Sequence, residues 1–153
     1  MITPTLDLER SLAAQGYDLI TGFDEVGRGA LAGPVMVGCA AIWACDLAPL
    51  DGDDSAELSG RTYLGVPDGV ADSKMLTEHR REAIFDELRD WCAAYAVGQA
   101  SNTEIDEWGI TYALGVAALR AHQLDERAGR EGIMLGGDGE ALAARGVRDV
   151  FIL

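Results

Sequence analysis

The sequence predicts an α/β protein with a mixed β-sheet flanked by helices. Three observations favour this class: two apolar, strand-like runs follow each other near the N-terminus, a helical period of apolar residues comes next, and a further strand and helix repeat that order. This alternation is typical of a layered α/β domain. The expected strands cover residues 17–25, 33–44, 95–100 and 132–135, and the expected helices cover 6–15, 77–92 and 101–127.

The first two strands differ in the side chains that they carry. Residues 17–25 run from an apolar half into two acids, which indicates a strand with an exposed end. Residues 33–44 are rich in small and β-branched side chains such as Val35 and Val37, which predicts burial on both faces. The apolar run at 150–153 is expected to begin another element.

Capping residues mark the starts of the two long helices. Thr77 is a good N-cap for the helix that runs to residue 92. Ser101 and Glu104 form the S-x-x-E capping box that opens the longest helix. Helical spacing then predicts the buried stripes, which are Ile84, Leu88, Trp91 and Cys92 in the first helix and Ile105, Trp108, Tyr112, Val116 and Leu119 in the second. Trp108 and Tyr112 are therefore expected in the core rather than as a platform for stacked bases.

Composition restricts the functional class. A net charge of −14 is unfavourable for gripping phosphates, so contact with nucleic acid would need a local patch or bridging cations. Three cysteines without C-x-x-C spacing argue against a disulfide framework or a zinc site and predict a cytoplasmic protein. No apolar run is long enough to span a membrane, so no membrane partner is expected. The segment 45–69, rich in acids and glycine, is expected to form an exposed loop.

Two adjacent acids, Asp24 and Glu25, stand at the expected end of the first strand. Their hard oxygen atoms suit Mg²⁺ or Mn²⁺. Successive side chains of a strand face opposite sides, so these two converge only if the strand ends or bends there. Gly27 and Gly29, just downstream, permit such a bend. From the residues alone, a solvated hairpin turn remains the alternative.

A second polar segment, Asp72-Ser73-Lys74, lies just before the helix at 77–92. A hydroxyl, an ammonium group and the N–H groups of a helix start together suit a phosphate. Lys74 is the only lysine among the 12 basic residues of the chain. The alternative is ordinary helix capping by Asp72 or Ser73, with Lys74 in solvent.

Three segments, in this order, resemble the motifs of ribonuclease HII, the type 2 RNase H family. Residues 22–35, GFDEVGRGALAGPV, are similar to its N-terminal signature, and residues 71–76, ADSKML, to its Asp-Ser-Lys-x-Leu segment. Residues 102–110, NTEIDEWGI, resemble the start of a family helix. The resemblance implies an RNase H-like fold. It also implies an endonuclease that cleaves the RNA strand of RNA–DNA hybrids and incises at ribonucleotides embedded in DNA.

The resemblance implies a catalytic and metal-binding set of three carboxylates. Asp24 would be the central ligand, Glu25 would hold a second metal or its water, and Mn²⁺ or Mg²⁺ would be the cofactor. The third family carboxylate is an aspartate in an Asp-Gly context at the end of a strand. Here Leu135 is followed by glycine, and an Asp-Gly pair comes two residues after the expected position, which keeps the strand face. Asp138 is therefore the candidate.

By the same resemblance, two groups of residues contact the substrate. Gly27, Arg28 and Gly29 would read the 2′-hydroxyl at the RNA–DNA junction, and Ser73 with Lys74 would hold a nearby phosphate. The expected partner is an RNA–DNA hybrid or DNA that contains ribonucleotides, and no obligate protein partner is evident.

The family domain has roughly 200 residues, a normal size for one domain. Residues 1–153 are therefore expected to form one type 2 RNase H domain, comprising its N-terminal two thirds to three quarters and truncated or altered after about residue 135. Three functions stay open. They are an active ribonuclease, an inactive family member that retains metal or weak hybrid binding, and a nucleotide-phosphate binding domain built on the glycine-rich turn.

Overall fold

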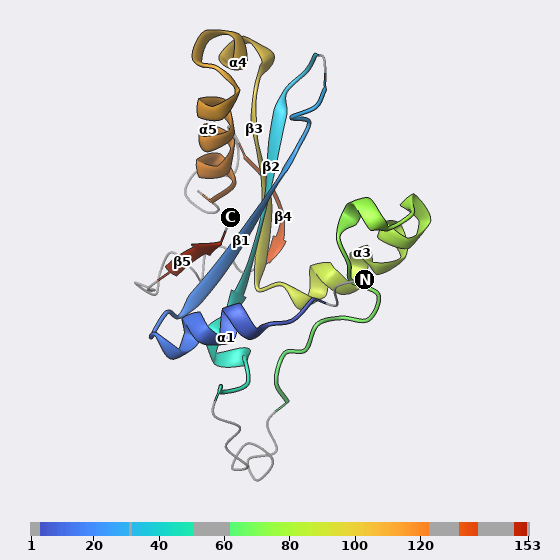
Figure 1. The fold of residues 1–153 in the computed structure, drawn as a ribbon, viewed down its shortest axis with the longest axis vertical. Helices are drawn as coiled ribbons and strands as arrows, with labels where there is room; N and C mark the ends of the chain where they lie inside the picture. Colours follow the sequence, from blue (N-terminus) through green and yellow to red (C-terminus); the bar gives the residue numbers. More distant parts are fainter. Residues whose placement is uncertain (1–3, 31, 51–61, 123–131, 138–148, 153) are drawn as a thin grey trace.

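The computed structural model describes residues 4–30, 32–50, 62–122, 132–137 and 149–152 of the 153-residue chain. The strands are β1 Leu19–Val26, β2 Val35–Trp43, β3 Ala94–Ala100, β4 Gly132–Gly137 and β5 Asp149–Ile152. The helices are α1 Asp7–Ala14, α3 Glu78–Trp91, α4 Asn102–Trp108 and α5 Ile110–His122, with 3₁₀ turns η1 Ala44–Asp46 and η2 Ser73–Met75. The predicted α/β class with a mixed sheet is confirmed (Figure 1).

The five strands form one sheet in the order β4-β3-β2-β1-β5. The strands β1 to β4 are antiparallel neighbours in chain order, whereas β5 runs parallel to β1. A parallel neighbour needs a crossover connection, and α4, α5 and β4 all precede β5 in the chain. β1 is therefore an interior strand with β2 on one side and β5 on the other.

Helices cover the two faces of the sheet at different places. α5 lies against β2 and β3 on one face (Figure 1). On the other face, Leu6 beside α1 joins Ile20, Ile42 and Leu47 in a buried cluster. Leu19, the neighbour of Ile20, belongs to a cluster on the opposite face, as strand alternation requires. The N-terminal half of β1 is thus buried on both sides, and only its C-terminal end is exposed.

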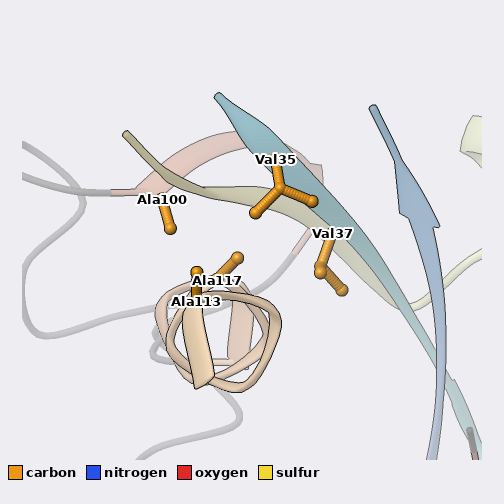
Figure 2. Packing of buried hydrophobic residues seen from close by; sticks show 5 residues of the cluster. All are labelled: Val35, Val37, Ala100, Ala113 and Ala117. Carbon is orange, nitrogen blue, oxygen red and sulfur yellow. The ribbon is translucent and has the colours of Figure 1, made fainter. Parts of the chain in front are cut away.

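α5 approaches the sheet closely at Gly98 of β3. A Cβ atom at Gly98 would collide with the carbonyl oxygen of Ala117 and lie 2.5 Å from the amide nitrogen of Ala121. The helix accordingly presents its smallest side chains to the sheet, and Ala113, Ala117 and Ala121 have no exposed surface. Figure 2 shows the resulting cluster of Val35, Val37, Ala100, Ala113 and Ala117.

The single helix predicted at 101–127 is wrong. It divides into α4 and α5 at Gly109, whose φ of +83° and ψ of 155° depart from helical values and favour glycine. The predicted buried stripe is wrong at Trp108, Tyr112 and Leu119, which are 42%, 63% and 62% exposed. It holds at Ile105, which packs against the buried cluster beneath α5. The turn at Gly109 resets the helical phase, and the close approach to the sheet admits only small side chains. Alanines therefore take the buried positions.

Both predicted N-caps are confirmed. The Thr77 hydroxyl accepts the N–H of Arg80 at 3.4 Å at the start of α3. At the start of α4 the Ser101 hydroxyl accepts the N–H of Glu104 at 3.2 Å, and the Glu104 carboxylate accepts the N–H of Ser101 at 2.7 Å. These reciprocal bonds form the capping box and satisfy backbone donors that the helix leaves unpaired.

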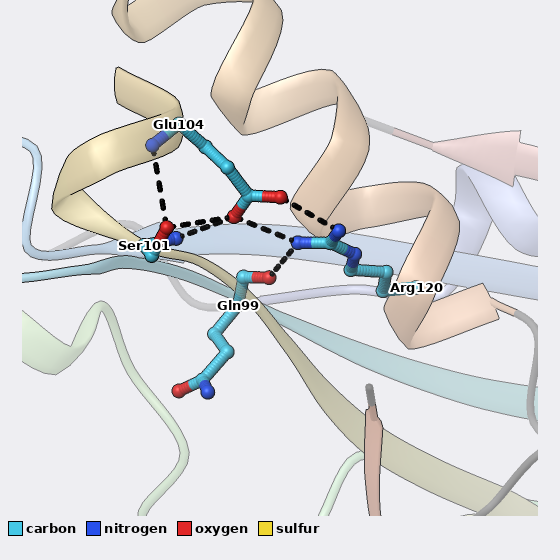
Figure 3. A network of polar contacts seen from close by, with 4 residues as sticks. All are labelled: Gln99, Ser101, Glu104 and Arg120. Atoms are coloured by element: carbon cyan, nitrogen blue, oxygen red, sulfur yellow. Dashed lines mark hydrogen bonds and ion pairs between the residues drawn. The ribbon is translucent and has the colours of Figure 1, made fainter. Parts of the chain in front are cut away.

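Glu104 also connects α4 to α5. Its carboxylate accepts two hydrogen bonds from Arg120, at 2.8 and 3.1 Å, and Arg120 donates a third to the carbonyl oxygen of Gln99 at 2.9 Å (Figure 3). The Arg120 guanidinium and the Ser101 amide lower the pKa of Glu104 to about 2. A charge-assisted, bidentate pair of this kind is strong and directional, so it fixes α5 against the end of β3.

The segment 45–69 packs on the core at its two ends. Leu47 is buried, and the indole N–H of Trp91 donates to the carbonyl oxygen of Gly65 at 2.7 Å. The exposure predicted for the whole segment therefore does not extend to Leu47, and residues 51–61 lie outside the described residues. Among the described helices, none combines the length and apolar character that a membrane crossing needs.

Candidate active site

A cleft of about 260 Å³ opens between the C-terminal end of β1 and helix α5. Among the described residues that line it, the charged ones are Asp24, Glu25 and Arg28, which come from β1 and the turn that follows it. The other lining residues are apolar and come from β1, β2 and α5, namely Phe23, Val37, Leu114, Gly115 and Ala118. The structure therefore brings both predicted acids and the predicted arginine to one site.

The two acids occupy the exposed end of β1. Asp24 pairs with Gly38 of β2, and Glu25 pairs with Val37. Alternation directs their side chains to opposite faces of the strand, and both residues line the cleft at the exposed end of β1. One oxygen of Asp24, Oδ1, accepts the backbone N–H of Glu25 at 3.0 Å. This bond restricts the orientation of the Asp24 carboxylate.

The turn after β1 depends on glycine. Gly27 has φ +94°, and a Cβ there would lie 3.0 Å from the carbonyl oxygen of Pro34. A side chain at this position would therefore meet both backbone strain and a tight contact. Gly29 is exposed, and a Cβ there would meet nothing within 4 Å among the described residues. Of the predicted triplet, Arg28 lines the cleft, and its guanidinium lies 3.6 Å from the Glu25 carboxylate.

The predicted phosphate-binding residues Ser73 and Lys74 lie in the 3₁₀ turn η2, which precedes α3 in the chain. Asp72 Oδ1 accepts the N–H of Lys74 at 2.9 Å, so Asp72 caps this turn. Arg81 donates to the carbonyl oxygen of Ser73 at 3.1 Å. The side chains of Ser73 and Lys74 are exposed, and neither lines the cleft. Their phosphate-binding role stays a prediction.

The strand that flanks β1 on its outer side is β5, not β4. In the parallel register Gly22 lies opposite Ile152, the last residue of β5. β5 therefore ends beside β1 two residues before Asp24. β4 pairs with β3 at the other edge of the sheet, and its last residue, Gly137, is three strand spacings, roughly 14 Å, from β1. Asp138 lies outside the described residues, and its role as third carboxylate stays a prediction.

The donor atoms of this site fit a hard divalent cation. Asp24 and Glu25 supply adjacent, exposed carboxylates, and Mg²⁺ is commonly bound by one or two carboxylates together with water and substrate phosphate. Within the described ranges no three His, Cys, Asp or Glu residues gather as a metal cluster. Among the described residues of the cleft, two adjacent carboxylates are thus available to such an ion. The ion pair between Glu25 and Arg28 is half exposed and therefore weak.

The chain is similar to proteins named ribonuclease HII. No protein-family model matches the chain. The ribonuclease HII of Streptomyces avermitilis is 46% identical over 119 residues, which are 77% of this chain and 43% of that protein. The ribonuclease HII of Roseiflexus castenholzii is 38% identical over 124 residues, 76% of this chain and 48% of that protein.

The chain belongs to the ribonuclease HII family. It spans less than half the length of the curated relatives that it matches. A solved structure, the ribonuclease H2 from Pyrococcus horikoshii OT3, is 32% identical and aligns with a TM-score of 0.38 over 58% of this chain and 35% of that chain.

Sequence reasoning missed one wall of the cleft. Leu114, Gly115 and Ala118 of α5 face the acids of β1 across the cleft. The predicted stripe lay on another side of the helix, so these three residues were given no role. None of them carries a reactive group. The available signal was Gly115 itself, because glycine in a helix interior is unfavourable unless a neighbour or a ligand needs the space.

Proposed function

We propose that this chain carries part of the active site of an endoribonuclease that cleaves the RNA strand of RNA–DNA hybrids and incises at ribonucleotides embedded in DNA. The observation that carries the proposal is the placement of Asp24, Glu25 and Arg28 on one cleft, in a chain whose relatives are named ribonuclease HII. A cytoplasmic location, which the cysteine usage predicts, accords with this activity.

Each residue of the β1 end has a role in this proposal. Asp24 and Glu25 would hold Mn²⁺ or Mg²⁺. When bound, such an ion supplies Lewis-acid polarisation of the phosphodiester. Gly27 and Gly29 carry no side chain and are exposed, so their peptide groups can approach a 2′-hydroxyl, the group that distinguishes RNA from DNA. Arg28 places a positive charge at the rim of the cleft, where a phosphate would enter.

The net charge of −14 sets the conditions for substrate binding. A polyanion is repelled by the chain as a whole, so we propose that binding depends on divalent cations at Asp24 and Glu25 and weakens steeply as salt rises. Ser73 and Lys74, which are exposed on η2, would hold a phosphate at a distance from the cleft.

Calorimetric titration with MnCl₂ tests the acids directly. Wild type is expected to bind the ion, and Asp24→Asn and Glu25→Gln are expected to lose most of that binding. The matched control is Asp68→Asn, which neutralises an exposed acid that does not line the cleft. If both cleft variants bind Mn²⁺ as tightly as wild type, the cation-binding site lies elsewhere.

The activity is tested by nicking of a labelled duplex that contains one ribonucleotide, in Mn²⁺, with Asp24→Asn as the blank. Product above that blank supports the ribonuclease. Cation-dependent binding of the duplex without any product would instead support the alternative of a family member that binds but does not cleave.

A further inference from the structure

Two glycines lie where α5 and the sheet approach each other, and packing explains only one of them. At Gly98 a Cβ would lie 2.5 Å from the amide nitrogen of Ala121, so the closeness of the helix requires glycine. At Gly115 a Cβ would meet no heavy atom of the described residues within 4 Å. Gly115 also lacks the positive φ that favours glycine. Within the described structure, neither contact nor conformation accounts for it.

Gly115 is also unfavourable for the helix in which it stands. It is the sixth residue of the thirteen-residue α5, and only proline is a poorer residue than glycine in a helix interior. Its position is exposed and lines the cleft between Leu114 and Ala118, across from Asp24 and Glu25. A side chain at 115 would therefore occupy the cleft without disturbing the described core.

We propose that Gly115 keeps this cleft open for one sugar–phosphate unit of the nucleic-acid strand, and so sets which nucleotide Asp24 and Glu25 can reach. The volume of about 260 Å³ is below the roughly 300–1,000 Å³ of pockets for drug-sized ligands, so it suits one nucleotide unit rather than a base pair. The apolar wall that includes Phe23 suits the C–H edges of a sugar ring. The Arg28 guanidinium suits its phosphate, as would a divalent cation held by Asp24 and Glu25. The proposal rests on the proposed function and adds the residue that controls access.

Three variants separate access from helix stability. Gly115→Ala removes a poor helix residue and should raise the melting temperature by about 2–4 °C, while it narrows the cleft. Gly115→Leu fills the cleft. The matched control, Thr111→Ala, also improves the helix propensity of α5, at an exposed position that does not line the cleft.

Fluorescence anisotropy with a duplex that contains one ribonucleotide, in Mn²⁺, gives the binding readout. Thr111→Ala should bind like wild type. Gly115→Ala should bind more weakly, and Gly115→Leu should lose at least about tenfold in affinity because the bound sugar would be overpacked. Calorimetric binding of Mn²⁺ alone should be unchanged in all three variants.

The outcomes distinguish this proposal from the function on which it rests. Wild-type affinity for the duplex in Gly115→Leu overturns the role of Gly115 and leaves the proposed function intact. A fall in the melting temperature of Gly115→Ala shows that the glycine serves packing, which also overturns it. A wild-type chain that binds neither Mn²⁺ nor the duplex defeats both proposals together.

Discussion

The close approach of α5 to β3 makes Gly98→Ala the most informative single substitution in the fold. The new Cβ would lie 2.5 Å from the amide nitrogen of Ala121, whereas ordinary contacts begin at 3.4 Å. It would also collide with the carbonyl oxygen of Ala117. Both partners are backbone atoms, which cannot rotate away, so the whole helix must shift by about 1 Å from the sheet.

The cost of this shift follows from the packing that it disturbs. Overpacking a core costs about 1–3 kcal/mol, and removal of glycine from a strand returns about 0.5–1 kcal/mol. We expect a net loss of about 1–2 kcal/mol in the free energy of unfolding, which corresponds to a melting temperature lower by about 2–8 °C for a chain of this size. The alanines that have no exposed surface, Ala113, Ala117 and Ala121, would then lose contact with β2 and β3.

Urea unfolding followed by circular dichroism measures this loss. The matched control is Gly22→Ala in β1, where an added Cβ meets no heavy atom of the described residues within 4 Å. The control should be neutral or slightly stabilising, because it removes strand glycine without a clash. If Gly98→Ala is as stable as Gly22→Ala, α5 does not lie on β3 in the described way.

Three further predictions concern charge, thiols and the β1 turn. Because Arg120 lowers the pKa of Glu104 from 4.5 to about 2, ionised Glu104 stabilises the fold above pH 4.5 and loses this effect as the pH falls towards 2. The stability gap between wild type and Glu104→Gln in urea should therefore be full at pH 7 and close below about pH 2, and a gap that does not change with pH would refute the role of the charge. Burial raises the pKa of Cys39 to about 12, so a thiol reagent at pH 8 should modify exposed Cys45 in the native protein and Cys39 only after unfolding; equal rates would contradict this. Gly27→Ala, at φ +94° and with a carbonyl oxygen 3.0 Å from its Cβ, should cost about 1–2 kcal/mol in a thermal melt, and an unchanged melt would show that the turn can adopt another conformation.

Local signals predicted the elements on which the site depends. The capping box at Ser101 and Glu104 and the N-cap at Thr77 involve residues within one helical turn, so the sequence contains both partners of each bond. The exposed acidic end of β1 could also be predicted. Asp24 and Glu25 follow an apolar run directly, and a strand that becomes charged at its end is leaving the core.

Pairing between distant strands could not be predicted in the same way. Residues 149–152 and 132–137 are both short, largely apolar runs after α5. Neither run contains a residue pattern that identifies the strand with which it pairs. The structure places the first beside β1 and the second at the far edge beside β3. That difference bears on Asp138, because the strand before it ends three strands from the acidic pair.

By itself the sequence determined the order of the strands β1 to β4, the capped helix starts and the acidic pair at a strand end, because each rests on neighbouring residues. The tertiary structure decided which face of α5 is buried, because that face depends on how near the helix comes to Gly98. It also decided that Gly115 faces the acids across a cleft. A helical pattern gives the spacing of side chains around an axis, but only packing against a sheet fixes the rotation of that axis and the space left beside it.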